Sequence, residues 1–225
     1  MTVLAPAAMD ADALERARFM LRMRARGVGD LRLLRALERV PRAMFMPQRY
    51  ADICSRDIAL PIGCGQTAPP PSIVAAMIEA LDVRPGARVL EVGGGTGYAS
   101  ALLAQMAEEI LALERCQTLA VEAAERLTAF GLDNVEVAFA DGLTFQPERG
   151  QFDRILVHGL IEAPATRLME LLAPAGALVA VMLDEAAGEQ RIVRLARDAA
   201  GEIRASAHGP ARSFSPLVRG LARAL

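Results

Sequence analysis

Apolar residues in the first third of the chain recur three or four positions apart, the spacing that places them on one face of a helix. This pattern predicts a helix over residues 10–26 and a second helix that Asp30 caps and Pro41 ends. A third predicted helix carries the apolar stripe Val74, Met77, Ile78 and Leu81. Residues 42–71 lie between the second and third helices, contain many prolines and glycines, and are predicted to be irregular. We expect residues 1–9 to form a loose tail.

The pattern changes from residue 88 onward, where short apolar runs alternate with helical segments. Runs typical of buried strands occupy residues 89–92, 110–113, 135–139, 155–157 and 177–183. Helical spacing returns between most of them, over residues 98–106, 119–130 and 166–172. Residues 190–197 roughly alternate between polar and apolar, as a half-exposed strand does. Strands that alternate with helices at this interval predict an α/β fold with a doubly wound, mostly parallel sheet.

The first predicted strand runs directly into a glycine-rich loop, and a helix is predicted to begin at about Tyr98. Residues 93–97 read Gly-Gly-Gly-Thr-Gly. Glycines at alternate positions let the backbone turn tightly and let a ligand approach without a Cβ atom in the way. The N-terminus of the following helix presents free N–H groups to a carboxylate or a phosphate. Taken alone, such a loop is either a ligand-binding turn or only a tightly packed one.

Acidic residues at the predicted strand ends narrow the choice of ligand. A dinucleotide-binding loop reads Gly-x-Gly-x-x-Gly, whereas here Glu91 precedes glycines at alternate positions. Glu91 would repel a pyrophosphate but could pair with the ammonium group of an amino acid. Glu114 follows Gly97 by 17 residues and can accept hydrogen bonds from a ribose diol, and Asp141 with Gly142 can contact an adenine edge. An amino acid, a ribose and an adenine describe S-adenosylmethionine, and a nicotinamide-dependent oxidoreductase is disfavoured.

The composition excludes several other classes of protein. The 225 residues are 53% hydrophobic and 23% charged, which is ordinary for a globular enzyme with one large core and an appendage. A net charge of -2 gives no electrostatic support for a nucleic-acid or membrane partner. All 25 basic residues are arginines, which excludes lysine chemistry. The three cysteines lack metal-ligand spacing, and no export signal or membrane span is apparent, so we expect a cytoplasmic protein without a metal.

The chain resembles the protein-L-isoaspartate O-methyltransferase family, which repairs damaged aspartyl and asparaginyl sites by methylating the abnormal carboxylate. The resemblance runs from Ala17 almost to the C-terminus. It rests most on residues 60–67, Leu-Pro-Ile-Gly-Cys-Gly-Gln-Thr, in line with residues 89–98, Val-Leu-Glu-Val-Gly-Gly-Gly-Thr-Gly-Tyr. Further shared motifs are Arg24-Ala25-Arg26-Gly27, Val40-Pro41-Arg42, Phe45, Phe152-Asp153 and Pro216-Leu217-Val218.

The resemblance implies an S-adenosylmethionine-dependent methyltransferase with a seven-stranded sheet. An N-terminal helical addition would occupy residues 1–60, and the cofactor-binding domain would occupy residues 61–225, with residues 214–217 returning to the substrate cleft. The residues implied to bind the cofactor are Gln66, Thr67, Glu91, Gly93, Gly95, Thr96, Gly97, Tyr98, Glu114, Arg115, Asp141, Gly142 and His158. The implied substrates are damaged proteins or peptides that bear isoaspartate, and the oligomeric state stays open.

One departure from the family pattern concerns the substrate. The family usually reads Gly-Gln-Thr-Ile-Ser-x-Pro, with the serine at the substrate carboxylate, whereas residues 65–71 read Gly-Gln-Thr-Ala-Pro-Pro-Pro. Pro69 therefore stands at the serine position and offers neither a hydroxyl nor a backbone N–H. Thr67 and Ser72 are the remaining candidate catalytic residues for orienting the carboxylate. We expect weak turnover of isoaspartyl peptides.

Two other interpretations of the function stay open: a methyltransferase of this fold with a different substrate, and an S-adenosylmethionine-binding protein without turnover. Methyl transfer to an ionised carboxylate needs no general base, so loss of the serine does not remove an obligatory group. His158 is either a cleft residue or a strand-end histidine with a local hydrogen bond, and we favour the second. For Cys64 we favour an inert loop side chain over a reactive thiol.

Overall fold

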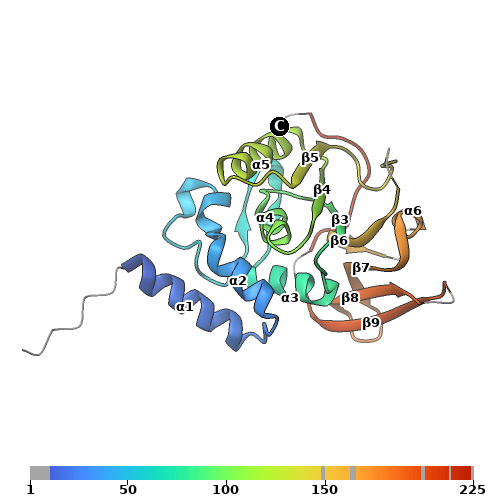
Figure 1. Cartoon of the computed structure of the whole chain (residues 1–225), viewed down its shortest axis with the longest axis horizontal. Helices are drawn as coiled ribbons and strands as arrows, with labels where there is room; N and C mark the ends of the chain where they lie inside the picture. The colour runs from blue at the N-terminus through green and yellow to red at the C-terminus, as the bar shows by residue number, and fades with distance from the viewer. Residues whose placement is uncertain (1–10, 148–149, 163–165, 199–200, 213, 224–225) are drawn as a thin grey trace, which may run out of the picture.

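The computed structural model describes residues 11–147, 150–162, 166–198, 201–212 and 214–223. The tail expected at residues 1–9 lies outside these ranges. Figure 1 shows helices α1 and α2 at one side of the molecule, a sheet in the middle, and strands β7, β8 and β9 at the opposite side. Within the described ranges, no helix has the length and apolar character needed to cross a bilayer.

The three predicted N-terminal helices are confirmed. Helix α1 spans Ala11–Ala25, α2 spans Leu31–Arg39 and α3 spans Pro71–Leu81. Asp30 caps α2, because its side chain accepts a hydrogen bond of 2.7 Å from the backbone N–H of Arg32. The sequence alone therefore fixes these elements to within a residue or two.

Residues 42–71, expected to be irregular, contain several very short elements. Three 3-10 turns occur at Arg42–Phe45 (η1), Gln48–Tyr50 (η2) and Gly63–Gly65 (η3). Strands β1 (Leu60–Pro61) and β2 (Thr67–Ala68) pair antiparallel on either side of η3. Two-residue strands leave no periodic signal, which is why the sequence pattern does not predict this β1–η3–β2 ribbon.

The main sheet has seven strands in the order β5-β4-β3-β6-β7-β8-β9. The strands are β3 (Arg88–Val92), β4 (Glu109–Glu114), β5 (Val135–Phe139), β6 (Phe152–Ile161), β7 (Leu172–Asp184), β8 (Glu189–Arg197) and β9 (Ile203–Pro210). The pairs from β5 to β7 are parallel, and the β7–β8 and β8–β9 pairs are antiparallel. The other helices are α4 (Tyr98–Ala104), α5 (Gln117–Ala129) and α6 (Thr166–Glu170). The predicted α/β class with a mostly parallel sheet is confirmed.

Two expectations for the second half need correction. The helix expected over residues 166–172 ends at Glu170, and Leu172 already begins β7. Strand β9 was not expected, since most of its side chains are exposed and its sequence lacks a clear alternation. It forms because β8 offers a free edge with which it pairs from Arg197–Ile203 to Arg191–Pro210.

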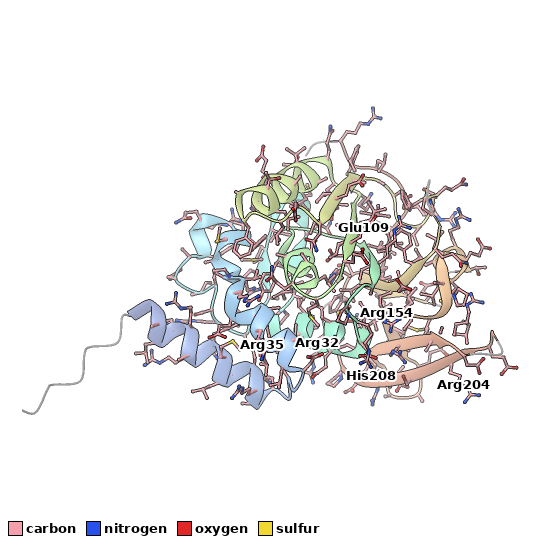
Figure 2. The ribbon with its side chains drawn as sticks, viewed as in Figure 1. Arg32, Arg35, Glu109, Arg154, Arg204 and His208 are labelled. Atoms are coloured by element: carbon pink, nitrogen blue, oxygen red, sulfur yellow. The ribbon has the colours of Figure 1, made fainter. Side chains whose placement is uncertain are left out.

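Strand β9 ends the sheet at one edge, and its side chains are mostly in solvent. Arg204 and His208 project from this strand (Figure 2), and the Nε atom of Arg204 lies 3.0 Å from an Asp198 carboxylate oxygen. Charged and polar side chains on an open edge discourage pairing with another chain.

The hydrophobic core covers both faces of the sheet. Val89 and Leu90, successive residues of β3, belong to different buried clusters, because successive side chains of a strand point to opposite faces. The cluster around Val89 also contains Phe19 and Phe45 from the N-terminal part of the chain. The N-terminal helices therefore share a core with the sheet, and the division of the chain at residue 60 stays a prediction.

The position of β3 decides where a ligand can bind. It lies between β4 and β6, so the chain reverses its direction of winding beside it. Ligands of open α/β sheets bind in the crevice outside the carboxyl ends of the strands at such a switch point. The glycine-rich loop follows β3 at this crevice.

Candidate active site

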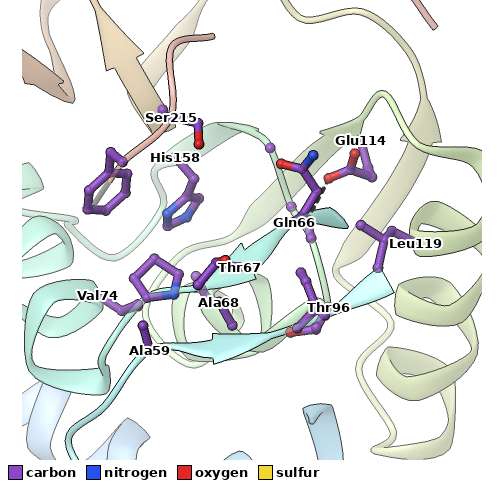
Figure 3. A pocket seen from close by; sticks show the side chains of 18 of the residues that line it. Ala59, Gln66, Thr67, Ala68, Val74, Thr96, Glu114, Leu119, His158 and Ser215 are labelled. Atoms are coloured by element: carbon purple, nitrogen blue, oxygen red, sulfur yellow. Dashed lines mark hydrogen bonds between the residues drawn. The ribbon is translucent and has the colours of Figure 1, made fainter. Parts of the chain in front are cut away.

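A cavity of about 380 Å³ lies at the carboxyl ends of β3 and β4, within the size range of small-molecule sites. The parts of the chain that line it include the glycine loop (residues 93–97), the β1–η3–β2 ribbon, the ends of β4 and β6, and a C-terminal segment that we define as residues 211–212 and 214–223. Figure 3 shows Gln66, Thr67, Glu114, His158 and Ser215 around this space. The predicted site residues that line it are Gln66, Thr67, Pro69, Gly93, Gly95, Thr96, Tyr98, Glu114, Arg115 and His158.

The glycine loop adopts the tight turn that its spacing predicts. Gly93, Gly95 and Gly97 have φ angles of 84°, 56° and 87°, in the left-handed region that penalises a residue with a Cβ atom. The backbone N–H groups of Gly93 and Gly94 donate to the carbonyl oxygen of Leu113 at 2.8 and 3.1 Å. Main-chain hydrogen bonds therefore fix this loop against the end of β4.

Glu114 joins the glycine loop to the start of α5. One carboxylate oxygen accepts the backbone N–H of Gly95 at 2.8 Å, and the other accepts the backbone N–H of Cys116 at 2.8 Å. The side chain is buried yet lines the cavity. A carboxylate oxygen has two lone pairs, so each oxygen can accept one more hydrogen bond from a ligand. This geometry suits the predicted role at a ribose diol.

Glu91 differs from the expectation that it pairs directly with an ammonium group. Its side chain is fully buried and does not line the cavity. One carboxylate oxygen accepts the hydroxyl of Ser100, and the other lies 2.9 Å from Nε2 of His158. Ser100 of α4 and His158 of β6 bind the Glu91 carboxylate and separate it from the cavity. Glu91 therefore acts on the cavity through His158.

His158 makes the hydrogen-bonding contact that one interpretation predicted, and it also lines the cleft, as the other interpretation predicted. The favoured one, a local hydrogen bond, corresponds to its contact with Glu91. The side chain nevertheless lines the cavity. Figure 3 shows its ring facing strand β2, which carries Thr67. The Glu91 carboxylate fixes the orientation of the ring.

Asp141 and Gly142 line a second, smaller pocket of about 30 Å³ rather than the main cavity. A Cβ atom at Gly142 would clash with Cγ1 of Val92, so this glycine allows a close approach of its loop to β3. The Asp141 carboxylate accepts the backbone N–H groups of Leu143 at 2.9 Å and of Gly220 at 2.7 Å. Asp141 therefore holds the C-terminal segment here, and its contact with adenine stays a prediction.

The C-terminal segment returns to the cleft, as expected. The backbone of Leu160 donates to the carbonyl oxygen of Ser215 and accepts from the N–H of Leu217, both at 2.9 Å. Farther along, Nε of Arg115 donates to the carbonyl oxygen of Gly220 at 2.7 Å. The side-chain amide of Gln190 makes two hydrogen bonds of 3.0 Å to the backbone of Phe214. Sequence reasoning did not find Gln190, because its partner is distant in sequence.

The β1–η3–β2 ribbon and the residues that follow it carry the side chains predicted to orient the substrate carboxylate. Gln66 and Thr67 are exposed and line the cavity, together with Pro69. Ser72 does not line the cavity, because its hydroxyl and its backbone N–H both donate to Asp57, at 2.9 and 3.0 Å. The structure therefore separates Ser72 from the group that it was predicted to join.

Arg42, which the sequence analysis named only as part of a shared motif, supports the chain that leads to the cavity. Its guanidinium is buried and donates to the carbonyl oxygens of Cys54, Arg56, Ile58 and Pro69, at 2.9 to 3.3 Å. Burial lowers the pKa of Arg42 from its usual value, and the opposing influence of Tyr98 and Cys54 is smaller. The Arg42 side chain thus holds together, by hydrogen bonds, the backbone of residues 54–58 and the backbone at Pro69.

Tyr98 begins α4 at the floor of the cavity. Its ring is buried against Phe45, with ring centroids 6.1 Å apart. Its hydroxyl has no hydrogen-bond partner among the described residues. Burial raises the pKa of Tyr98, so the phenol stays protonated.

Comparison with known proteins gives one consistent family. The profile of the protein-L-isoaspartate(D-aspartate) O-methyltransferase family matches residues 15–221. A protein-L-isoaspartate O-methyltransferase of Methylorubrum populi is 45% identical over 200 residues, which cover 89% of this chain and 92% of that protein. Protein-L-isoaspartate O-methyltransferase 2 of Rhodopseudomonas palustris is 39% identical over 211 residues, which cover 94% and 96%.

A solved structure has the same fold as this chain. The protein-L-isoaspartate O-methyltransferase of Plasmodium falciparum, determined in complex with S-adenosyl-L-homocysteine, superposes with a TM-score of 0.77. The superposition covers 91% of this chain and 98% of that one at 20% sequence identity. At this identity, the likeness concerns the fold.

Proposed function

The chain belongs to the protein-L-isoaspartate(D-aspartate) O-methyltransferase family, and on that premise we propose that its cavity binds S-adenosylmethionine and methylates the carboxylate of L-isoaspartyl residues. The observation that carries the proposal is the hydrogen-bonding contact between the glycine loop and Glu114. The hydrogen bond of 2.8 Å from the Gly95 N–H to the Glu114 carboxylate brings the two predicted cofactor contacts together on the floor of the cavity. The protein is an S-adenosylmethionine-dependent methyltransferase.

The residues of the cavity fit this cofactor. The glycine loop leaves room for a ligand against the backbone, and Glu114 keeps lone pairs for two ribose hydroxyls. His158 lines the cavity with its ring held by Glu91. We infer that adenine extends toward the smaller pocket beside Asp141, because Arg115 lines both spaces.

When bound, S-adenosylmethionine supplies a methyl group on a positively charged sulfur. A substrate carboxylate with an ordinary pKa is already ionised at neutral pH, so the protein needs no general base. Its residues must hold the carboxylate in line with the methyl group and exclude water. Thr67 is the candidate for the first task, since its side chain lines the cavity and Figure 3 shows it opposite His158.

Pro69 provides no hydrogen-bond donor that could help to orient the substrate carboxylate. Its ring lines the cavity where the family places a serine, and its carbonyl oxygen is already bound by Arg42 at 2.9 Å. The residue therefore contributes shape but no donor to the carboxylate. We infer slow turnover of isoaspartyl peptides together with ordinary cofactor affinity. We also infer a cytoplasmic location and damaged proteins or peptides, rather than nucleic acid or membrane, as partners.

One assay tests the proposal. The purified protein is incubated with S-adenosylmethionine labelled in its methyl group and with an isoaspartyl peptide, beside a normal aspartyl peptide of the same sequence. We expect base-labile methyl esters on the isoaspartyl peptide alone. Cofactor binding without methylation of either peptide would mean that the acceptor is a different molecule.

A further inference from the structure

Two of the three cysteines meet across the rim of the cavity, although they are 52 positions apart in the sequence. Cys116 belongs to the buried cluster around Val89, Cys64 packs against the same cluster, and the two thiols interact electrostatically. Cys64 lies in η3, in the middle of the β1–η3–β2 ribbon, and Cys116 is the N-cap residue of α5. We propose that this pair is a redox-sensitive modification site, at which a peroxide converts the two thiols into a disulfide that fastens the ribbon to α5.

The packing around the pair supports a bond between these two elements. A Cβ atom at Gly63 would lie 3.3 Å from Cδ2 of Leu119 in α5, so the backbone of η3 already rests against the helix. Cys64 has φ of 57° and ψ of 29°, a left-handed conformation that a cysteine adopts only where its surroundings impose it. The Cys116 side chain makes no capping hydrogen bond to α5. The two cysteines therefore lie on elements that pack against each other, and no capping hydrogen bond occupies the Cys116 thiol.

The two sulfurs differ in access, which assigns their roles. Cys64 is half-buried, so a small oxidant can reach it, whereas Cys116 is buried. Burial, with the Glu114 carboxylate and the Cys64 thiol, raises the pKa of the Cys116 thiol to about 11, which makes it a poor first target. Cys54 is also buried, and its thiol donates to the carbonyl oxygen of Tyr50 at 2.9 Å.

The reaction balances with hydrogen peroxide as the two-electron oxidant. The Cys64 sulfur forms a bond to one peroxide oxygen while the O–O bond breaks, which gives a sulfenic acid at Cys64 and one water. The Cys116 sulfur then displaces the hydroxyl group from the Cys64 sulfur. The displaced hydroxyl leaves with the Cys116 thiol proton as a second water. Two thiols and one peroxide thus become one disulfide and two waters.

The position of the bond predicts its effect. Gly65, Gln66 and Thr67 on the ribbon and Glu114, Arg115 and Leu119 beside Cys116 line the same cavity (Figure 3). The ribbon cannot move away from α5 without separating Cys64 from Cys116. The disulfide therefore holds this rim closed and slows the exchange of cofactor and product. This consequence rests on the proposed function, whereas formation of the bond does not.

Peptide mapping tests the bond. Trypsin cleaves after arginine but not before proline, which places Cys54, Cys64 and Cys116 in separate peptides of residues 50–56, 57–88 and 116–126. After peroxide treatment of the full-length protein and digestion without reductant, we expect peptides 57–88 and 116–126 to be joined, two hydrogen masses below their sum. The Cys54→Ser variant should give the same product, and Cys64→Ser and Cys116→Ser should not. Overoxidised single peptides without the joined pair would overturn the proposal.

The exchange of ligand tests the closed rim. We expect the dissociation rate of S-adenosylhomocysteine from the oxidised protein to fall at least about fivefold and to recover after dithiothreitol. The Cys64→Ser variant, treated in the same way, should keep the rate of the reduced protein. Equal rates with the mapped disulfide present would overturn the closing role. Failure of the reduced protein to bind either ligand would instead count against the proposed function.

Discussion

The floor and the wall of the cavity acquire their shapes in different ways. The floor, formed by the glycine loop and Glu114, is held by main-chain N–H groups at 2.8 to 3.1 Å from their acceptors. The wall, formed by residues 66–69 and the C-terminal segment, meets the cavity mostly through exposed or half-buried side chains, with Ala68 and Phe214 buried. Side chains far from the chemistry support this wall, with Arg42 behind Pro69 and Gln190 behind Phe214.

This difference explains why the cofactor is easier to infer than the acceptor. Main-chain hydrogen bonds and left-handed glycines constrain residue identity, so the floor leaves a motif in a contiguous stretch of sequence. The wall joins segments more than a hundred positions apart, and many residue types can line it. We therefore propose that Pro69, at the position that the sequence resemblance assigns to a serine, changes the wall without disturbing the floor.

The largest effect is expected on the floor. A valine at position 95 would place branched atoms in the space above the loop and strain a φ angle of 56°. We expect Gly95→Val to weaken S-adenosylmethionine binding by about 4 kcal/mol, roughly a thousandfold, as measured by titration calorimetry. Gly131→Val is the matched control, since Gly131 has a φ of 81° and open space around it. Equal loss of binding in both variants would mean that backbone strain, rather than the ligand, demands glycine.

The support of the wall should be the next most sensitive feature. Arg42→Met removes a buried guanidinium and leaves four carbonyl oxygens without that donor. We expect the free energy of unfolding, from urea titration, to fall by about 3 kcal/mol. Arg35→Met, at an exposed position of α2 labelled in Figure 2, should change it little. Similar stability of both variants would show that water replaces the guanidinium without cost.

Glu114 tests whether the floor recognises the ribose. Glu114→Gln retains one acceptor oxygen but loses the charge that strengthens hydrogen bonds from a ribose diol. We expect weaker binding of S-adenosylmethionine by about 2 kcal/mol and little change for methionine alone. Glu109→Gln, at the other end of β4, is the control. Equal weakening of both ligands would make Glu114 purely structural.

The smallest effect is expected at the substituted serine position. Pro69→Ser adds a hydroxyl and a backbone N–H beside the cavity, and its carbonyl oxygen can still accept from Arg42. We expect kcat on an isoaspartyl peptide to rise about tenfold, or ~1.4 kcal/mol, with unchanged cofactor affinity. Pro61→Ser alters an exposed proline of the same ribbon that does not line the cavity. Fast turnover by the unmodified protein would show that Thr67 suffices.

The sequence predicted the elements whose signals are local. Helical periodicity predicted α1, α2 and α3, short apolar runs predicted β3 to β7, polar–apolar alternation predicted β8, and glycine spacing predicted the turn after β3. Strand β9 and the β1–η3–β2 ribbon escaped prediction because each depends on a partner strand rather than on its own pattern.

Which side chains reach the cavity was decided only by the tertiary structure. Strand-end position alone grouped Glu91, Glu114 and Asp141, yet β6 encloses Glu91, and the C-terminal segment occupies Asp141. Proximity in the chain suggested Ser72, but Asp57 takes its hydroxyl. The spacing of Cys64 and Cys116 in the sequence does not indicate that both pack into one buried cluster. Hydrogen-bond partners are chosen by the packing of distant segments, which periodicity and motifs along one chain do not encode.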